Sequence, residues 1–185
     1  GIDDVVAALG RLPGTELLVA GGPPAADLGA DPEARRLGEL AARLGVGGAV
    51  HLLGAVPRAE VPGLLRSADV VACVPWYEPF GIVPLEAMAC GVPVVGSAVG
   101  GLLDTVVHGS TGLLVPPRDP AAVSAALGRL LGDPALRARM GGEAADRVRR
   151  CFTWDRVAGS TLDLYRRLRA GGPLPAADAS WAVTA

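Results

Sequence analysis

Short apolar runs alternate with longer amphipathic segments along most of the chain. The runs have the length of strands, are rich in valine, and lie at Glu16–Ala20, Val50–Leu53, Val70–Val74, Val92–Gly96 and Gly112–Val115. Most are continuously apolar, as is typical of strands that are covered by helices on both faces. The pattern therefore predicts an α/β fold in which a Rossmann-like parallel sheet carries helices on both faces.

The segments between these runs have the boundary signals of helices. They predict helices at Ile2–Arg11, Pro32–Leu44, Arg58–Ser67, Ile82–Ala89, Leu102–His108, Pro120–Leu131, Pro134–Cys151 and Thr153–Arg169. Asp119 and Asp133 each precede a proline, which joins a capping carboxylate to a residue that suits the first helical turn. Gly45 and Gly91 follow two of the predicted helices, where a left-handed C-cap is favoured.

The periodic part of the chain predicts one domain, residues 1–170, with a sizeable core. Residues 171–185 are rich in Gly, Ala and Pro and have no periodicity, so we expect a disordered tail there. The sequence begins with a predicted helix, and no predicted strand precedes it. In a doubly wound sheet the first strand usually lies at the centre. We therefore expect a gap between the strands Glu16–Ala20 and Val70–Val74, and we interpret the chain as a fragment.

Composition excludes several classes of partner and chemistry. The net charge of −2 gives no global positive field for nucleic acid, and no apolar stretch is long enough to span a bilayer. The N-terminal residues lack the pattern of a signal peptide, so we expect a soluble, cytoplasmic protein. All 17 basic residues are arginine, which excludes a Walker-type phosphate loop and a Schiff-base lysine within this sequence.

The cysteines and histidines do not predict a metal site. Cys73, Cys90 and Cys151 form no CxxC pair, and their surroundings are typical of small buried hydrophobic residues. His51 and His108 are isolated from each other along the chain. We expect no metal and no disulfide.

One segment combines a strand, a sharp turn and a helix. It runs from Pro75 to Glu86 after the strand Val70–Val74, and ligands of open α/β sheets bind at the carboxyl edge where such turns lie. Gly81 permits close approach of the backbone to a ligand, and the first amides of the following helix favour a phosphate. Glu86 lies one turn after Ile82, about 5.4 Å along the helix axis.

These positions suggest roles for two carboxylates. Glu86 could accept hydrogen bonds from both hydroxyls of a ribose beside the phosphate, and Glu78 on the loop could meet the sugar at the other end of the ligand. By spacing alone, both glutamates could equally be solvated surface charges.

The segment Glu78–Glu86 resembles the E-x7-E motif of glycosyltransferase family 4, which comprises retaining enzymes of the GT-B fold. The likeness extends from Gly1 to about Leu168 and includes Gly21–Pro23, Leu53–Val56, Ser67–Val70, Glu86–Val95, Gly100-Gly101 and His108–Val115. The chain is similar to the C-terminal, donor-binding half of that fold.

The resemblance implies a role for each matching position. It makes Glu78 the catalytic glutamate that contacts the transferred sugar and makes Glu86 the ligand of the ribose hydroxyls. It implies that the backbone at Phe80, Gly81, Ile82 and Val83 holds the sugar and diphosphate. Val56 would border the base, and Gly21 and Gly22 would form a turn at the donor cleft, although a plain tight turn explains the two glycines as well.

The resemblance also implies what the whole protein does. A hexosyl group would pass from a nucleoside diphosphate sugar to an acceptor hydroxyl with retention, without metal or other cofactor. Two departures weaken the match: Asp104 is the nearest acid after Gly100-Gly101, where the family usually has glutamate, and the family's arginine and lysine just upstream of Gly1 are absent. The N-terminal acceptor domain is missing too, so we expect this chain alone to be inactive.

Other functions stay open. A noncatalytic nucleotide-sugar binding remnant fits the missing strand, and a nucleotide-sugar epimerase is less consistent with the E-x7-E pattern. A dinucleotide oxidoreductase is disfavoured because no strand is followed by GxGxxG. The base, sugar, linkage and acceptor are not specified, and the full enzyme could contact a membrane peripherally.

Overall fold

The structure is a computed structural model that describes residues 1–171. Its strands are β1 (Leu17–Ala20), β2 (Val50–Gly54), β3 (Val71–Cys73), β4 (Val94–Ser97) and β5 (Gly112–Val115). Its α-helices are α1 (Ile2–Leu9), α2 (Pro32–Arg43), α3 (Val61–Ser67), α4 (Ile82–Ala89), α5 (Leu102–Thr105), α6 (Pro120–Leu131), α7 (Pro134–Cys151) and α8 (Trp154–Arg169). Two 3-10 turns, η1 (Ala25–Asp27) and η2 (Gly47–Ala49), complete the order.

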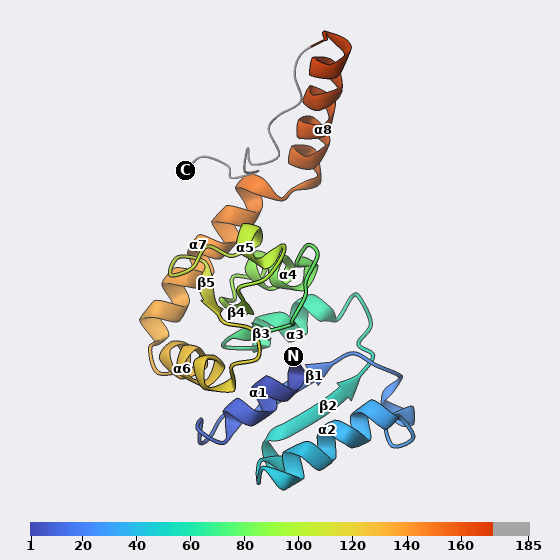
Figure 1. Cartoon of the computed structure of the whole chain (residues 1–185), viewed down its shortest axis with the longest axis vertical. Coiled ribbons are helices and arrows are strands. Elements are labelled where there is room, and N and C mark those ends of the chain that lie inside the picture. The colour runs from blue at the N-terminus through green and yellow to red at the C-terminus, as the bar shows by residue number, and fades with distance from the viewer. Residues whose placement is uncertain (172–185) are drawn as a thin grey trace.

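All strand pairs are parallel, as predicted, but the strands form two separate sheets. β1 pairs with β2, and β4 lies between β3 and β5. Among the described residues β1 and β3 each have one edge without a strand partner, and Figure 1 shows the β1–β2 pair set apart from the other three strands. This confirms the predicted gap between these two strands, whereas the interpretation of the chain as a fragment stays a prediction.

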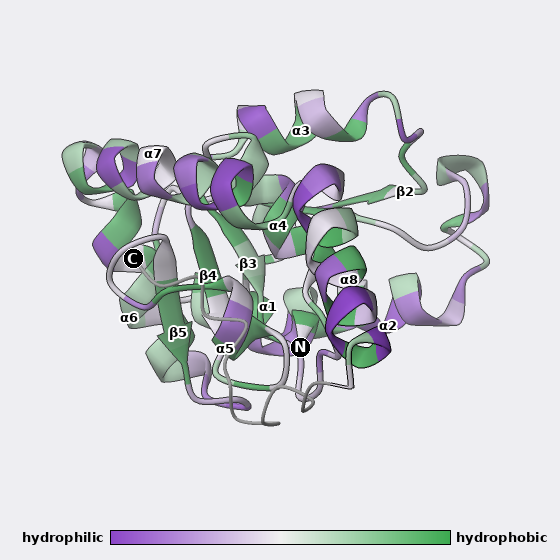
Figure 2. Ribbon diagram, turned by 90° about the horizontal axis from the view of Figure 1, so that it is seen from above, coloured by the Kyte–Doolittle hydropathy of each residue, from purple (hydrophilic) through white to green (hydrophobic). Residues whose placement is uncertain are grey.

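Helices cover both faces of the three-stranded sheet and form two cores. On one face α1 and α6 pack around Val95 and Leu113, and on the other α4 and α7 pack around Val94. Val94 and Val95 are neighbours on β4 and point to opposite faces, as side chains of a strand must. Figure 2 shows the sheet as a layer between these helices.

The predicted caps are confirmed. The Asp119 and Asp133 carboxylates accept hydrogen bonds from the amides of Ala122 and Leu136, each at 2.9 Å. Gly45 and Gly91 have φ of +72° and +77°, the left-handed conformation that was expected after α2 and α4. The carboxylate of Asp31 caps α2 in the same way, a cap that the sequence reading missed.

Some element bounds differ from the prediction for local reasons. α5 ends at Thr105, three residues before His108, because Val106 is extended and the amide of Val107 donates to the Thr111 hydroxyl. Among the described strands only β4 is buried at every position, whereas Leu18 of β1 is 44% exposed, so the expectation of strands covered on both faces was wrong for β1.

Helix α8 projects from the rest of the molecule in Figure 1 and has no buried residue. The predicted tail, residues 171–185, lies outside the described residues apart from Gly171. Across residues 1–171, none of the helices has both the length and the apolar character needed to cross a membrane.

Replacing Asp119 by alanine should lower the free energy of unfolding by about 1 kcal/mol, because the Ala122 amide loses its capping acceptor. Urea denaturation of the 185-residue chain measures this change. Asp27→Ala removes an exposed carboxylate without a described side-chain partner and should change the stability little. Equal losses in the two variants would contradict a specific capping role.

Candidate functional site

The turn between β3 and α4, together with the start of α4, carries most of the predicted site residues at one edge of the three-stranded sheet. β3 ends at Cys73, and α4 begins at Ile82 with Gly81 as its N-cap residue. Gly81 has φ of +92°, a conformation that glycine adopts without the strain of a side chain. The chain can therefore reverse sharply at Gly81 and point the first amides of α4 outward at the carboxyl edge.

The Glu78 carboxylate folds back over this turn. Its Oε1 atom accepts hydrogen bonds from the amides of Gly81 at 2.9 Å and Phe80 at 3.3 Å. The second oxygen, Oε2, has no hydrogen-bond partner among residues 1–171. The two amides thus fix the carboxylate and leave one of its oxygens available to a ligand.

This arrangement divides the predicted backbone donors into two pairs. The amides of Phe80 and Gly81 bind Glu78, whereas no described hydrogen bond engages the amides of Ile82 and Val83. The side chains of Ile82 and Val83 are exposed, and Pro84 in the same turn has no amide hydrogen. Two unpaired amides at a helix N-terminus, together with the helix dipole, favour an anion.

The glycine pair Gly100-Gly101 packs against the backbone of the Glu78 turn. The Gly101 amide donates to the Glu78 carbonyl at 2.8 Å, and a methyl group at Gly101 would lie 2.5 Å from the Phe80 Cα. Gly100 has φ of +46°, and a methyl group at this position would overlap the Glu78 carbonyl. The Thr105 hydroxyl bonds to the Gly101 carbonyl at 3.0 Å and lies below Gly81, so α5 braces both ends of the turn.

Glu86 lies on α4, one turn after Ile82, as predicted. It is exposed and has no described hydrogen-bond or ion-pair partner. A carboxylate that is exposed to water has no desolvation cost in the folded chain, and it can accept hydrogen bonds from a ligand. The geometry is compatible with the predicted contact to two ribose hydroxyls.

The remaining predicted site residues lie at the ends of β1 and β2. Gly21 and Gly22 have φ of +130° and +88°, and the Gly21 amide donates to the Gly54 carbonyl at 2.8 Å. Val56 follows β2 and is half-buried. No described hydrogen bond joins this turn to the Glu78 loop, so the structure places these residues on the two-stranded sheet, apart from the Glu78 turn.

The pKa of the Cys73 thiol is raised by its surroundings. Burial raises the pKa of this thiol to about 11, and the Glu78 carboxylate nearby adds to the rise. Cys73 is half-buried and is a free cysteine in the structure.

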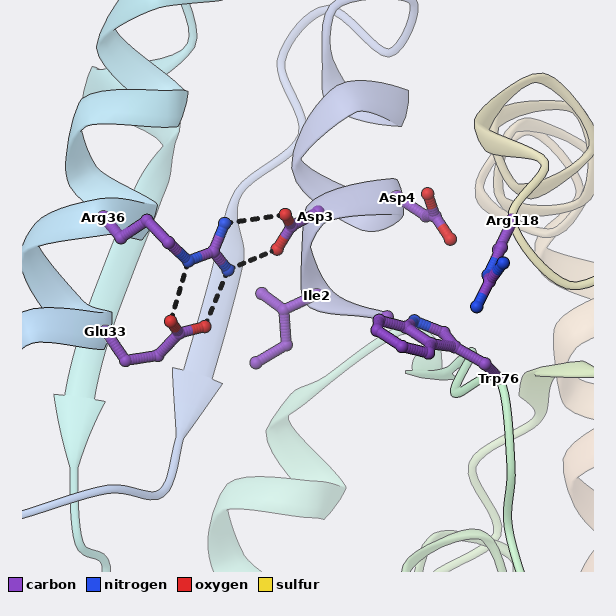
Figure 3. Close-up of a pocket in the computed structure, with 8 residues that line it drawn as sticks. Ile2, Asp3, Asp4, Glu33, Arg36, Trp76 and Arg118 are labelled. Carbon is purple, nitrogen blue, oxygen red and sulfur yellow. Dashed lines mark hydrogen bonds and ion pairs between the residues drawn. The ribbon is translucent and has the colours of Figure 1, made fainter.

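A pocket opens beside the turn, but none of the predicted site residues lines it. Figure 3 shows its walls: the first turn of α1, Glu33 and Arg36 of α2, and the side chains of Trp76 and Arg118. Sequence reasoning missed Trp76 and Arg118, since the contact between them joins segments that are distant along the chain. Within residues 1–171, no group of His, Cys, Asp and Glu side chains could hold a metal ion.

A family model described as "Glycosyl transferases group 1" matches residues 1–147 of the chain. A D-inositol 3-phosphate glycosyltransferase from Streptomyces avermitilis is 44% identical over 147 residues, which are 80% of this chain and 31% of that protein. Sucrose-phosphate synthase from Thermosynechococcus elongatus superposes with a TM-score of 0.82 at 39% identity, covering 93% of this chain and 43% of that one.

A third similar protein is Anabaena HepE, solved in complex with UDP-glucose. It superposes with a TM-score of 0.77 at 28% identity, over 92% of this chain and 45% of that one. The chain therefore spans about a third of the curated relative and less than half of either solved structure.

Gly101→Ala should displace the Glu78 turn, because the new methyl group would overlap the Phe80 backbone. We expect a loss of about 1–3 kcal/mol in the free energy of unfolding, measured by urea denaturation. Gly38→Ala is a matched control, since Gly38 lies within α2 with open space around it, and it should raise stability by about 0.5–1 kcal/mol. If both substitutions proved stabilising, the claim that Gly101 packs closely against the Glu78 turn would be refuted.

The Cys73 thiol should react slowly with iodoacetamide until the pH approaches about 11, because only the thiolate is nucleophilic. Glu78→Gln should lower this pKa without restoring the ordinary value, since burial is the larger cause. Peptide mass spectrometry of alkylation against pH measures both. An unchanged Cys73 profile in the Glu78→Gln variant would argue that the carboxylate lies elsewhere.

Proposed function

The chain belongs to the glycosyl transferases group 1, with the fold of a GT-B C-terminal domain, and from this we propose that it binds the sugar donor of a retaining hexosyltransferase. The full reaction would move a hexosyl group from a nucleoside diphosphate sugar to an acceptor hydroxyl. Anabaena HepE, which is similar to this chain, was solved with UDP-glucose, and this supports a nucleotide sugar as the ligand.

The observation that carries the proposal is the pair of unpaired amides at Ile82 and Val83 with Glu86 one turn further along α4. The amides would hold the diphosphate, and Glu86 would accept hydrogen bonds from the ribose hydroxyls. Ligand groups at these positions would need no rearrangement of the backbone. Because the acceptor is a carboxylate, its bonds to the ribose hydroxyls would be charge-assisted.

Glu78 would act on the transferred sugar. Its Oε1 atom is fixed by the Phe80 and Gly81 amides, so Oε2 would be the oxygen that meets a sugar hydroxyl. A carboxylate that is oriented before the ligand arrives loses little entropy on binding. In this arrangement the Phe80 and Gly81 amides position Glu78, and their contribution to sugar binding is indirect.

Departure of the diphosphate builds negative charge that must be stabilised for transfer to occur. This part of the enzyme would supply the amides and dipole of α4. Cationic side chains that the family carries upstream of the segment matching Gly1 would supply the rest, and no metal would be required. We therefore propose that the 185-residue chain binds donor weakly and transfers nothing by itself.

A noncatalytic nucleotide-sugar binding protein is the second candidate function. The separation of the described strands into two sheets favours it, because no described strand pairing joins the two parts of the proposed donor cleft. A turnover assay on the natural full-length gene product, with nucleoside diphosphate hexoses and released diphosphate as the readout, separates the candidates. Transfer by the 185-residue chain itself would contradict our assignment of inactivity.

Glu86→Gln should weaken binding of a nucleoside diphosphate by about tenfold, because two charge-assisted hydrogen bonds become neutral ones. Isothermal titration calorimetry with UDP, GDP and ADP measures the effect and identifies the base. Addition of EDTA should leave the affinity unchanged.

Glu60→Gln is the matched control for this titration. Glu60 is exposed at the start of α3 and makes no side-chain capping bond, so its replacement should leave nucleotide affinity unaltered. The same affinity in Glu86→Gln as in the parent chain would rule out the proposed ribose contact.

A further inference from the structure

Arg147 joins helix α7 to the end of helix α5. Its Nε atom donates to the Thr105 carbonyl at 3.0 Å, and its Nη2 atom donates to the Asp104 carbonyl at 2.6 Å. Because α5 ends at Thr105, these carbonyls belong to its last turn and have no helical amide to bind. One guanidinium thus satisfies two backbone acceptors at the point where α5 stops.

The Arg147 guanidinium differs from its neighbours on α7 in what it binds. Arg137, Arg139 and Arg149 each form an ion pair with a carboxylate, whereas no ion pair engages Arg147 within residues 1–171. Its guanidinium carbon lies 5.5 Å from the centroid of the Phe152 ring, a cation–π contact that keeps the half-buried side chain in place. The hydrogen bonds of Arg147 are therefore directed to α5.

Helix α5 depends on such contacts because it is a single turn of four residues. Helices of this length are not stable in water by themselves. Its first residue, Leu102, is fully buried, so apolar packing fixes its start, whereas Arg147 binds its end. The position of α5 thus rests on a few tertiary contacts.

Thr105 connects Arg147 to the Glu78 turn. Thr105 is 1% exposed, and its amide and its hydroxyl each donate to the Gly101 carbonyl at 3.0 Å. The Gly101 amide in turn donates to the Glu78 carbonyl at 2.8 Å. Two residues, Thr105 and Gly101, therefore separate the guanidinium from the backbone of Glu78.

Thr105 also contacts the residue that orients the Glu78 carboxylate. A methyl group added at Gly81 would lie 3.1 Å from the Thr105 hydroxyl oxygen, and the Gly81 amide is the donor at 2.9 Å to Oε1 of Glu78. α5 therefore contacts the turn on both sides of the carboxylate, at Gly81 and, through Gly101, at the Glu78 carbonyl. A shift of α5 would change both contacts.

We propose that Arg147 is a positioning residue for Glu78. It fixes the end of α5, and α5 holds the turn in the conformation that leaves one oxygen of Glu78 available to a ligand. The value of this role to the enzyme rests on the proposed function, in which that oxygen meets the transferred sugar.

Arg137 provides a matched control on the same helix. It is half-buried like Arg147, and its Nη1 atom donates to the carbonyls of Leu130 at 2.9 Å and Leu131 at 2.7 Å. Its Nη2 atom pairs with Asp69 at 3.1 Å. Arg137 lies about 15 Å before Arg147 along α7, so Arg137→Ala removes the same kind of contact from the end of α6 instead of α5.

Amide NMR of the 185-residue chain tests the proposal without a ligand. The Gly81 amide bonds to a carboxylate, so Glu78→Gln, with its weaker neutral acceptor, should move the Gly81 amide proton upfield. Arg147→Ala should move this proton in the same direction. It should also speed hydrogen exchange at the Gly101 amide about tenfold more than Arg137→Ala does, because the turn opens locally. Arg137→Ala should leave the Gly81 proton in place.

Arg147→Lys is a second variant. Lysine keeps the charge but lacks the planar fork that reaches two carbonyls, so it should cause the same changes to a smaller extent. If Arg147→Ala does not fold, Arg147→Lys against Arg137→Lys carries the same comparison.

The proposal is overturned if the Gly81 proton stays in place when Arg147 is replaced, or if the Arg137 variants change Gly81 and Gly101 as much. This outcome is separate from the donor site. Failure of Glu86→Gln to weaken UDP binding would refute the proposed function and leave the positioning of Glu78 by Arg147 standing.

Discussion

The contact between Gly101 and the backbone of residues 78–80 is the constraint on which the candidate site depends. The Gly101 amide donates to the Glu78 carbonyl, and there is no room for a side chain between Gly101 and Phe80. Thr105 fixes Gly101 from α5, and Arg147 of α7 in turn donates to the carbonyls of Asp104 and Thr105. The turn is therefore held in place by α5 and, through α5, by α7.

Because the turn is fixed in this way, its polar groups can have separate roles. The Phe80 and Gly81 amides orient the Glu78 carboxylate, which leaves the Ile82 and Val83 amides unpaired at the start of α4. Preorganised donors are effective because they need no rearrangement when charge develops on a ligand.

Much of the fold could be predicted because its signals are local. Valine-rich runs, Asp-Pro caps and the glycines after α2 and α4 specify their own conformations, and the gap between β1 and β3 follows from a general rule of sheet topology. The end of α5 could not be predicted, because it depends on a bond from Val107 to Thr111. The hydrogen bonds of Glu78 and the stacking of Arg118 on Trp76 also depend on side-chain and tertiary geometry that spacing along the chain does not specify.

The central claim is that the start of α4 and Glu86 together bind a nucleoside diphosphate. A crystal structure of the chain with bound UDP tests it most directly. We expect the diphosphate against the amides of Ile82 and Val83, with both ribose hydroxyls on the Glu86 carboxylate and with Glu78 still bonded to the Gly81 amide. A nucleotide bound at another helix N-terminus, with Glu86 left in solvent, would contradict the claim.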